Sequence, residues 1–153
     1  MHMAKPSKDL LKLDQQLCFA MYSASRAMTK VYQPLLRPMG LTYPQYLVML
    51  VLWQRNQLTV SQIGDTLTLD SGTLTPLLKR LETAGLVVRM RDATDERKVI
   101  VALTAAGRAL KRQAATVPNA VMCATACDLD ELVLFTTQLN RLRSNLSAST
   151  NQE

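Results

Sequence analysis

Cys18 is the residue of this sequence best suited to chemistry, because a thiolate is a nucleophile that can be oxidised reversibly. Hydroxyl-bearing residues follow it at helical spacings of four, three, four and three residues, namely Tyr22, Ser25, Thr29 and Tyr32. This spacing places them with Cys18 on one face of a helix. Phenol and alcohol groups can donate hydrogen bonds to a thiolate without adding charge. The stripe therefore predicts a stabilised thiolate, although an inert core cysteine beside a polar helix edge gives the same pattern.

The distance of each phenol from Cys18 along the helix decides which one can donate a hydrogen bond to its thiolate. Tyr22 lies one helical turn from Cys18 and can contact it. Tyr32 lies about 21 Å farther along a straight helix and cannot reach the same thiol, so that contact would need a second copy of the chain. Cys18 itself is expected about two turns inside its helix, where the helix dipole helps little.

The number of cysteines and histidines limits the disulfide and metal chemistry that the chain can support. The chain has three cysteines, Cys18, Cys123 and Cys127, which cannot all pair within one chain and are free thiols by default in a reducing compartment. The only histidine is His2, and no cysteine spacing suits a zinc site. We therefore expect no metal and no cofactor.

Basic residues are concentrated in one part of the chain. Nine of the 18 Lys and Arg lie between Lys79 and Arg112, with only four Asp or Glu in the same span. A cluster of this kind is typical of proteins that bind a polyanion such as nucleic acid. A solvated face that only keeps the protein in solution is the alternative that charge alone leaves open.

The pattern of apolar residues predicts the elements that position these groups. A helix over residues 10–36 carries a heptad-like apolar seam that favours a partner helix, and Pro34, Pro38 and Gly40 are expected to end it. Further helices are expected over 43–54, from 59 or 60 to 67, from 70 or 71 to about 84, from 104 to about 117 where Pro118 breaks or kinks it, and from 128 onward.

The last helix has a capping-box start and an apolar seam of its own. Asp128 with Glu131 forms the box, and the tail 147–153 is expected to fray. The seam consists of Leu132, Phe135, Leu139, Leu142 and Leu146. Because one short chain cannot easily bury both terminal seams, we expect an interlocked homodimer.

Two β-branched runs, 86–91 and 98–103, flank the polar turn 92–97 and predict a hairpin. Two short helices followed by a basic hairpin form a winged helix-turn-helix pattern, in which the helix from Ser71 lies in a major groove of DNA. Arg97 at the hairpin tip could enter the minor groove. The residues expected to contact DNA are Ser71, Thr73, Thr75, Lys79, Arg80, Arg89, Asp95, Arg97 and Lys98.

Residues 69–107 resemble the recognition helix and wing of MarR-type regulators. The wing signature of that family is Asp-x-Arg, a hydrophobic strand and Leu-Thr-x-x-Gly, met here by Asp95, Arg97, Leu103, Thr104 and Gly107. The resemblance implies a winged-helix transcriptional repressor that binds double-stranded operator DNA. A winged helix used only for protein contacts is the alternative.

Residues 13–54 are similar to the first two helices of the OhrR branch of this family, the organic-hydroperoxide sensors. The resemblance implies that Cys18 is the peroxide-reactive thiol, that Tyr32 and Tyr43 hydrogen-bond it across the dimer, and that Tyr22 belongs to the same pocket. In branch members with a second cysteine near the end of the fifth helix, an intersubunit disulfide forms. Cys123 fits that resolving position, and Cys127 is expected to be a bystander.

Length and composition fit this interpretation. The 153 residues, 48% hydrophobic and 20% charged, exclude a disordered or low-complexity chain, and no apolar run approaches the roughly 18 residues of a membrane span. The N-terminal residues carry no apolar signal core, so we expect a cytoplasmic protein without a membrane partner. We expect one mainly helical domain over 1–153, with dimerisation helices at 10–37 and 105–147 and a winged helix-turn-helix lobe at 43–103.

Two other functions compete with the peroxide sensor. A MarR-type repressor released by a small phenolic or aromatic ligand would need no role for Cys18. A thiol peroxidase would be an enzyme whose basic segment is incidental, and the long match to the wing argues against it. We therefore expect a repressor rather than an enzyme.

Overall fold

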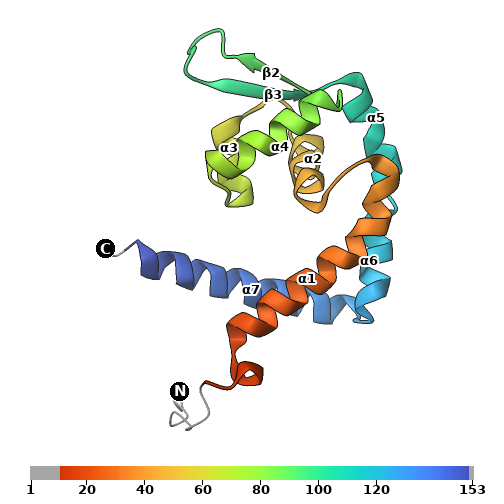
Figure 1. The fold of residues 1–153 in the computed structure, drawn as a ribbon, viewed down its shortest axis with the longest axis vertical. Coiled ribbons are helices and arrows are strands. Elements are labelled where there is room, and N and C mark those ends of the chain that lie inside the picture. Colours follow the sequence, from red (N-terminus) through yellow and green to blue (C-terminus); the bar gives the residue numbers. More distant parts are fainter. Residues whose placement is uncertain (1–10, 152–153) are drawn as a thin grey trace. The chain divides into compact units, whose positions relative to one another are not determined.

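The computed structural model describes residues 11–151 of the chain. These residues form two compact units, of which the first ends at Val117 and the second begins at Pro118. The fold is mainly helical with a small antiparallel sheet, as the sequence predicts (Figure 1). The single domain over 1–153 and its division into dimerisation helices and a DNA-binding lobe stay a prediction.

The first long helix, α1 (Leu17–Leu36), is shorter than the expected helix over 10–36. Residues Leu13–Gln15 form a separate 3-10 turn, and Gln16 has extended backbone. This extended residue interrupts the helical backbone just before α1, and glutamine is not one of the residue types that signal a helix start. The expected helix start is therefore wrong, and Cys18 is the second residue of α1 rather than one two turns inside.

Pro34 lies inside α1 and does not end it. The helix stops two residues later, where Arg37–Met39 form a 3-10 turn that includes Pro38. Gly40 follows with φ of +66°, a left-handed conformation that favours glycine. Pro38 and Gly40 thus mark the end of the helix as predicted, whereas Pro34 only removes one hydrogen-bond donor from it.

The central three helices begin at capped positions. Thr42 caps α2 (Tyr43–Gln54) and Thr59 caps α3 (Val60–Leu67), each in a capping box with the glutamine three residues on. Asp70 caps α4 (Ser71–Thr83), and Gly85 with φ of +74° follows its end. These boundaries agree with the sequence prediction, because the side chains that end helices are local signals.

The sheet has three strands rather than the two of the predicted hairpin. Strands β2 (Val87–Arg91) and β3 (Val99–Leu103) pair in antiparallel register, with Arg89 opposite Val101. The short strand β1 (Leu58–Thr59) pairs with the other edge of β3. Its two residues are too few to give a periodic signal, so the sequence did not reveal it.

The wing is fastened to the helix α5 (Ala105–Ala114) by the Leu-Thr-x-x-Gly segment. The Thr104 hydroxyl donates to the Gly85 carbonyl at 2.6 Å and accepts from the Gly107 N–H at 3.0 Å. A Cβ atom at Gly107 would run into the Leu86 carbonyl oxygen. Glycine is therefore required here by the close approach of α5 to the strand entry.

A continuous core joins the helices to the sheet. Helix α2 packs against α1, α3, α4 and α5, and the sheet covers α3 and α4 (Figure 1). Full burial of one such aliphatic side chain contributes about 1.5–3 kcal/mol. The fully buried side chains are Leu36, Val48, Met49, Leu52, Ile63, Leu74, Leu78, Leu81, Val87 and Val101.

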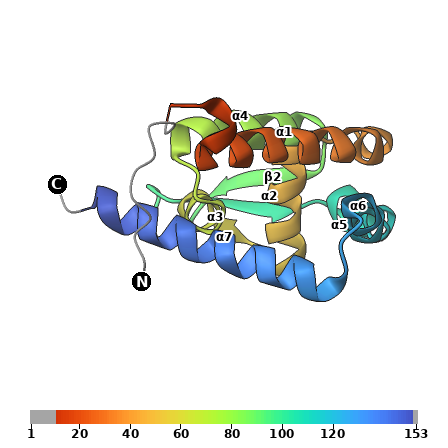
Figure 2. The same cartoon turned by 90° about the horizontal axis from the view of Figure 1, so that it is seen from below.

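The second unit contains α6 (Val117–Thr125) from its second residue onward and α7 (Leu129–Thr150), the latter a single long helix (Figure 2). Asp128 caps α7 in the predicted capping box. Two expected boundaries are wrong. Helix α5 already ends at Ala114, so that Pro118 stands in the first turn of α6, where its missing N–H costs nothing. The tail expected to fray is helical up to Thr150.

Among residues 11–151 no helix combines the length and apolar character needed to cross a membrane.

Candidate functional site

The N-terminal end of α4 presents small polar side chains. Ser71, Gly72 and Thr73 are exposed and Thr75 is half-buried, while the opposite face of the helix is buried through Leu74 and three further leucines. The Asp70 carboxylate accepts a hydrogen bond from the Thr73 N–H at 2.7 Å, and this bond holds the pKa of Asp70 below its ordinary value. The helix is thus anchored by its leucines and leaves its first turn free for contacts.

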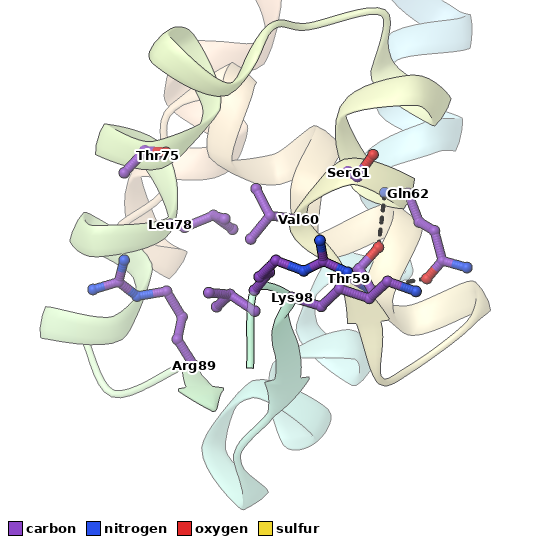
Figure 3. A pocket seen from close by; sticks show the side chains of 10 residues that line it. Thr59, Val60, Ser61, Gln62, Thr75, Leu78, Arg89 and Lys98 are labelled. Carbon is purple, nitrogen blue, oxygen red and sulfur yellow. Dashed lines mark hydrogen bonds between the residues drawn. The ribbon is translucent and has the colours of Figure 1, made fainter. Parts of the chain in front are cut away.

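A cavity of about 510 Å³ lies between α3, α4 and the wing (Figure 3). Three cations border it, Arg89, Arg97 and Lys98, together with the hydroxyl of Thr75. Arg89 is also paired with Glu82 at 2.7 Å, so part of its charge is neutralised. The remaining lining residues are Thr59, Val60, Ser61, Gln62, Leu78 and Val99. The structure therefore brings four of the predicted DNA-binding residues to one hollow.

The other predicted DNA-binding residues lie outside this cavity. Ser71 borders a second, smaller cavity of about 270 Å³ between α3 and α4. Lys79 and Arg80 are exposed toward the C-terminal half of α4, and Thr73 is exposed in its first turn. Exposed cations along the helix suit contacts to a phosphate backbone rather than to base edges.

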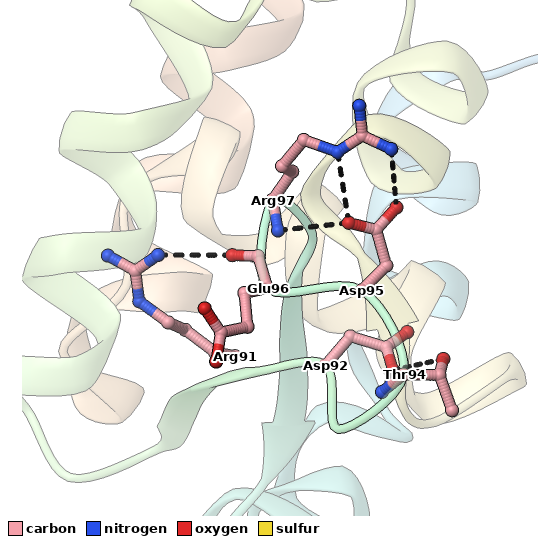
Figure 4. Close-up of polar contacts among 6 residues, drawn as sticks. All are labelled: Arg91, Asp92, Thr94, Asp95, Glu96 and Arg97. Carbon is pink, nitrogen blue, oxygen red and sulfur yellow. Dashed lines mark hydrogen bonds and ion pairs between the residues drawn. The ribbon is translucent and has the colours of Figure 1, made fainter.

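The wing tip is an ordered turn (Figure 4). The Asp95 carboxylate accepts from both the side-chain Nε and the backbone N–H of Arg97, each at 3.1 Å. These bonds, the side-chain bond first, hold the pKa of Asp95 below its ordinary value. Arg91 donates to the Glu96 carbonyl at 3.0 Å, and Asp92 accepts from Thr94.

The role of Asp95 follows from this geometry. Its carboxylate faces Arg97, whose side chain is 91% exposed. A carboxylate repels DNA phosphates, so Asp95 is suited to orienting Arg97 rather than to touching DNA itself. This explains in physical terms why the two residues occur together in the Asp-x-Arg pattern.

Cys18 lies in the first turn of α1 and is exposed. Negative charge is stabilised near the N-terminal end of a helix, where backbone N–H groups have no partner within the helix. The expected position of Cys18, about two turns inside the helix, is therefore wrong, because α1 begins at Leu17 and Cys18 lies where backbone N–H groups face outward from the helix end.

Tyr22, one turn after Cys18, has a partner that sequence reasoning missed. Arg26 donates from Nη1 to the Tyr22 hydroxyl oxygen at 2.9 Å, and its guanidinium lies 5.5 Å from the centre of the Tyr22 ring. A cation that donates to a phenol oxygen polarises the phenol O–H and makes it a better donor. The regular spacing of Cys18, Tyr22 and Arg26 by four residues was the signal that could have revealed this contact.

The structure brings the phenols of Tyr32 and Tyr43 together. Their ring centres are 4.7 Å apart, with Tyr32 on α1 and Tyr43 at the start of α2. Burial raises the pKa of both phenols above the ordinary value, and for Tyr32 the neighbouring Tyr43 and Tyr46 add to it. At neutral pH both side chains are therefore protonated and able to donate hydrogen bonds.

The three cysteines, all within residues 11–151, are free thiols. Cys123 is exposed near the end of α6, and Cys127 is half-buried just before α7. Cys127 Sγ lies 3.4 Å from the Thr125 carbonyl oxygen. In the same described range no cluster of His, Cys, Asp or Glu could hold a metal ion, and His2 lies outside it.

Comparison with known proteins shows the family to which the chain belongs. Residues 30–114 match the family model described as transcriptional regulator SarA/Rot. The organic hydroperoxide resistance transcriptional regulator of Bacillus subtilis (strain 168) is 51% identical over 114 residues, which cover 74% of this chain and 78% of that protein.

Solved structures share the fold. Reduced AbfR bound to DNA, a protein of Staphylococcus epidermidis, matches with a TM-score of 0.75 and 37% identity over 91% of this chain and 97% of that one. Disulfide-formed AbfR matches with a TM-score of 0.60 and 36% identity over 88% and 95%. The prediction that the chain is a regulator rather than an enzyme is confirmed by these matches. The chain belongs to the MarR/SarA family of winged-helix transcription regulators.

Proposed function

We propose that this protein is a homodimeric repressor that senses organic hydroperoxides through Cys18 and releases operator DNA after Cys18 forms a disulfide with the partner subunit's Cys123. The observation that carries the proposal is the position of Cys18. It is an exposed thiol in the first turn of a helix, and the same chain presents a pair of protonated phenols on a neighbouring part of the fold. These are the groups that a reactive thiolate needs.

The DNA-binding half of the proposal rests on α4 and the wing. Each subunit places the first turn of α4 in a major groove, where Ser71, Thr73 and Thr75 approach bases and phosphates. Lys79, Arg80, Arg89 and Lys98 contact the backbone, and Arg97 reaches the adjacent minor groove, held in direction by Asp95. The solved complex of the related AbfR with DNA supports this use of the fold.

The homodimer rests on apolar side chains that one chain leaves exposed. Between Leu129 and Thr150, all within the described part of the chain, no side chain is buried. Phe135, Leu139 and Leu146 of the predicted α7 seam are each more than half exposed, as is Leu17 on α1. Exposed apolar surface of this extent is typical of a protein interface. We infer that residues 10–37 and 105–147 form the interface between two copies.

The first chemical step is a two-electron oxidation of sulfur. The Cys18 thiolate attacks the terminal oxygen of the hydroperoxide, the S–O bond forms and the O–O bond breaks. The leaving alkoxide takes a proton and departs as the alcohol, so the peroxide is reduced and Cys18 becomes a sulfenic acid. Tyr22 of the same subunit, with Tyr32 and Tyr43 of the other, donates hydrogen bonds to the thiolate before attack.

The second step converts the sulfenic acid to a disulfide. The thiolate of the partner subunit's Cys123 attacks the Cys18 sulfur, the S–S bond forms, and hydroxide leaves with a proton as water. A disulfide needs the two Cα atoms within about 7 Å. If the reduced dimer holds the thiols farther apart, the helices must move, and that movement changes the spacing of the two α4 helices on DNA. The existence of a disulfide-formed structure of the related AbfR supports disulfide formation in a protein of this fold.

A non-reducing denaturing gel tests the proposal. The reduced protein receives one equivalent of an alkyl hydroperoxide, with Cys18→Ser, Cys123→Ser and Cys127→Ser treated in parallel. We expect a covalent dimer in the wild type and in Cys127→Ser, and none in the other two variants. A covalent dimer that persists in Cys123→Ser and disappears in Cys127→Ser would assign the resolving role to Cys127.

The cavity between α3, α4 and the wing favours one second candidate function. Its cations and hydroxyls suit a small aromatic acid or phenol, which would displace DNA without redox chemistry. In that case DNA release by the ligand would survive in Cys18→Ser, and peroxide would leave the mass of the wild type unchanged.

A further inference from the structure

One face of α2 carries a row of aromatic side chains. Tyr43, Tyr46 and Trp53 follow at intervals of three and seven residues, which places them on the same side of the helix. Helix α2 contacts α1 on one side and α5 on another (Figure 1). The row therefore extends from the phenol pair toward the base of the wing.

Tyr46 packs directly against the phenol pair. Its ring centre lies 5.7 Å from that of Tyr32 at an interplanar angle of 43°, a tilted contact. The Tyr32 ring thus touches two rings of α2, those of Tyr43 and Tyr46. Tyr46 is only 3% exposed, so its ring has little freedom to move away. Burial raises the pKa of Tyr46 as well, with a further contribution from Tyr43.

Trp53 also packs against Tyr46. The two ring centres are 6.4 Å apart in an edge-on arrangement, the geometry that aromatic rings prefer. The Trp53 indole N–H donates to the Gly107 carbonyl at 2.9 Å, and Lys111 donates to the Trp53 carbonyl at 3.5 Å. Since α5 is itself held against the strand entry at Gly107, the indole is fixed to a rigid part of the fold.

We propose that Tyr46 is a positioning residue of the peroxide reaction: its ring, backed by Trp53, holds the Tyr32 phenol in the direction from which it donates to the thiolate of the other subunit. The inference rests on the proposed function, in which the phenols of Tyr32 and Tyr43 serve Cys18. A hydrogen bond weakens steeply once its angle or distance departs from the ideal, so a ring that can rotate is a poorer donor. Tyr46 removes that freedom without touching the thiol.

The test is a double-mutant cycle on the rate of Cys18 oxidation by tert-butyl hydroperoxide, followed by alkylation of the remaining thiol and mass spectrometry. Tyr46→Leu and Tyr46→Met both remove the ring, Met with an unbranched, flexible side chain that can fill the space left behind, and Tyr46→Phe keeps the ring and removes the hydroxyl. Each variant is made in the wild type and in the Tyr32→Phe background. Leu52→Ala, another buried residue of α2, is the control for general loss of packing.

We expect Tyr46→Leu and Tyr46→Met to slow oxidation about five-fold, which corresponds to the loss of one aromatic contact. Tyr46→Phe should oxidise at the wild-type rate. In the Tyr32→Phe background the same changes at Tyr46 add no further slowing, because Tyr46 acts through the Tyr32 hydroxyl. Leu52→Ala lowers thermal stability and leaves the rate unchanged. Should Tyr46→Leu fail to fold, Tyr46→Met carries the same test.

Two outcomes would overturn the inference and are separable from each other. If Tyr32→Phe slows oxidation but the Tyr46 variants do not, or slow it equally in both backgrounds, Tyr46 is only a core residue and the proposed function stands. If Tyr32→Phe itself oxidises at the wild-type rate, the phenols have no part in the reaction, and the proposed thiol pocket fails together with the role of Tyr46.

Discussion

The DNA-binding lobe and the terminal helices differ in how much of their structure one chain can complete. From α2 to α5 the elements bury a common core, cap their own ends and fix the wing tip by internal hydrogen bonds. Helix α7 buries none of its side chains among the described residues, and the Cys18 end of α1 is exposed. This difference indicates that one subunit folds the elements proposed to contact DNA without help, whereas the proposed peroxide sensing needs two subunits.

The largest expected effect, on dimer stability and operator affinity, is that of a charge placed in the apolar seam of α7. Leu139→Arg would bury an uncompensated charge in the proposed interface, which costs several kcal/mol. We expect the dimer to dissociate and operator affinity to fall at least about 100-fold. Light scattering and a DNA-binding assay measure the two effects. Ser144→Arg, on the other side of α7, is the matched control, and equal behaviour of both variants would remove α7 from the interface.

Gly107→Ala tests the claim that the DNA-binding lobe owes its stability to its own packing. The added Cβ meets the Leu86 carbonyl oxygen, a backbone atom that cannot easily give way. We expect the free energy of unfolding to fall by about 2–3 kcal/mol, as for other overpacked sites. Gly72→Ala, where the new Cβ meets only the end of the Asp70 side chain at 3.4 Å, is the control and should be neutral or slightly stabilising. A normal unfolding midpoint for Gly107→Ala would show that the contact is not tight.

Arg97→Ala should weaken operator binding about ten-fold and reduce the slope of log affinity against log salt by about one. The loss arises because one exposed cation at the wing tip no longer displaces counterions from DNA. Arg141→Ala removes the same charge from α7 rather than from the wing and should leave the slope unchanged. If both variants keep the wild-type slope, the wing tip does not lie at the DNA.

The smallest expected effect is a loss of the hydrogen bonds between Asp95 and Arg97 at low pH. The pKa of Asp95 is lowered by its bonds from Arg97, so the stabilisation of the turn is fully present above the ordinary pKa of 3.8. It is lost as the pH falls through the lowered value. The Arg97 Nε–H resonance should follow this transition in NMR spectra. Asp95→Asn should lack it, and an unchanged transition in that variant would assign it to another group.

How much of this could be predicted from the sequence depended on whether the signal was local. Caps such as Asp70 and Asp128, and the glycine after α4, gave helix boundaries that the structure confirms. The start of α1 could not be predicted, because its N-cap residue, Gln16, is not one of the residue types that signal a helix start. The β1 strand was equally hidden, since it is defined by its pairing with β3 rather than by its own two residues.

The candidate site was predictable in its residue types but less so in its contacts. The Asp-x-Arg spacing gave the wing tip, and the structure adds that Asp95 orients Arg97. Tyr32 and Tyr43 were singled out by resemblance, and their 4.7 Å contact depends on how α1 packs on α2. Arg26 and Tyr46 were missed, because a cation and a buried ring on their own have many structural uses.

The most direct test of the account is the non-reducing gel on the reduced protein treated with one equivalent of tert-butyl hydroperoxide. The account predicts a covalent dimer that dithiol reverses and that both Cys18→Ser and Cys123→Ser abolish. A wild type that stays monomeric on the gel with an unchanged mass would contradict the thiol sensor and leave the small-ligand regulator in its place.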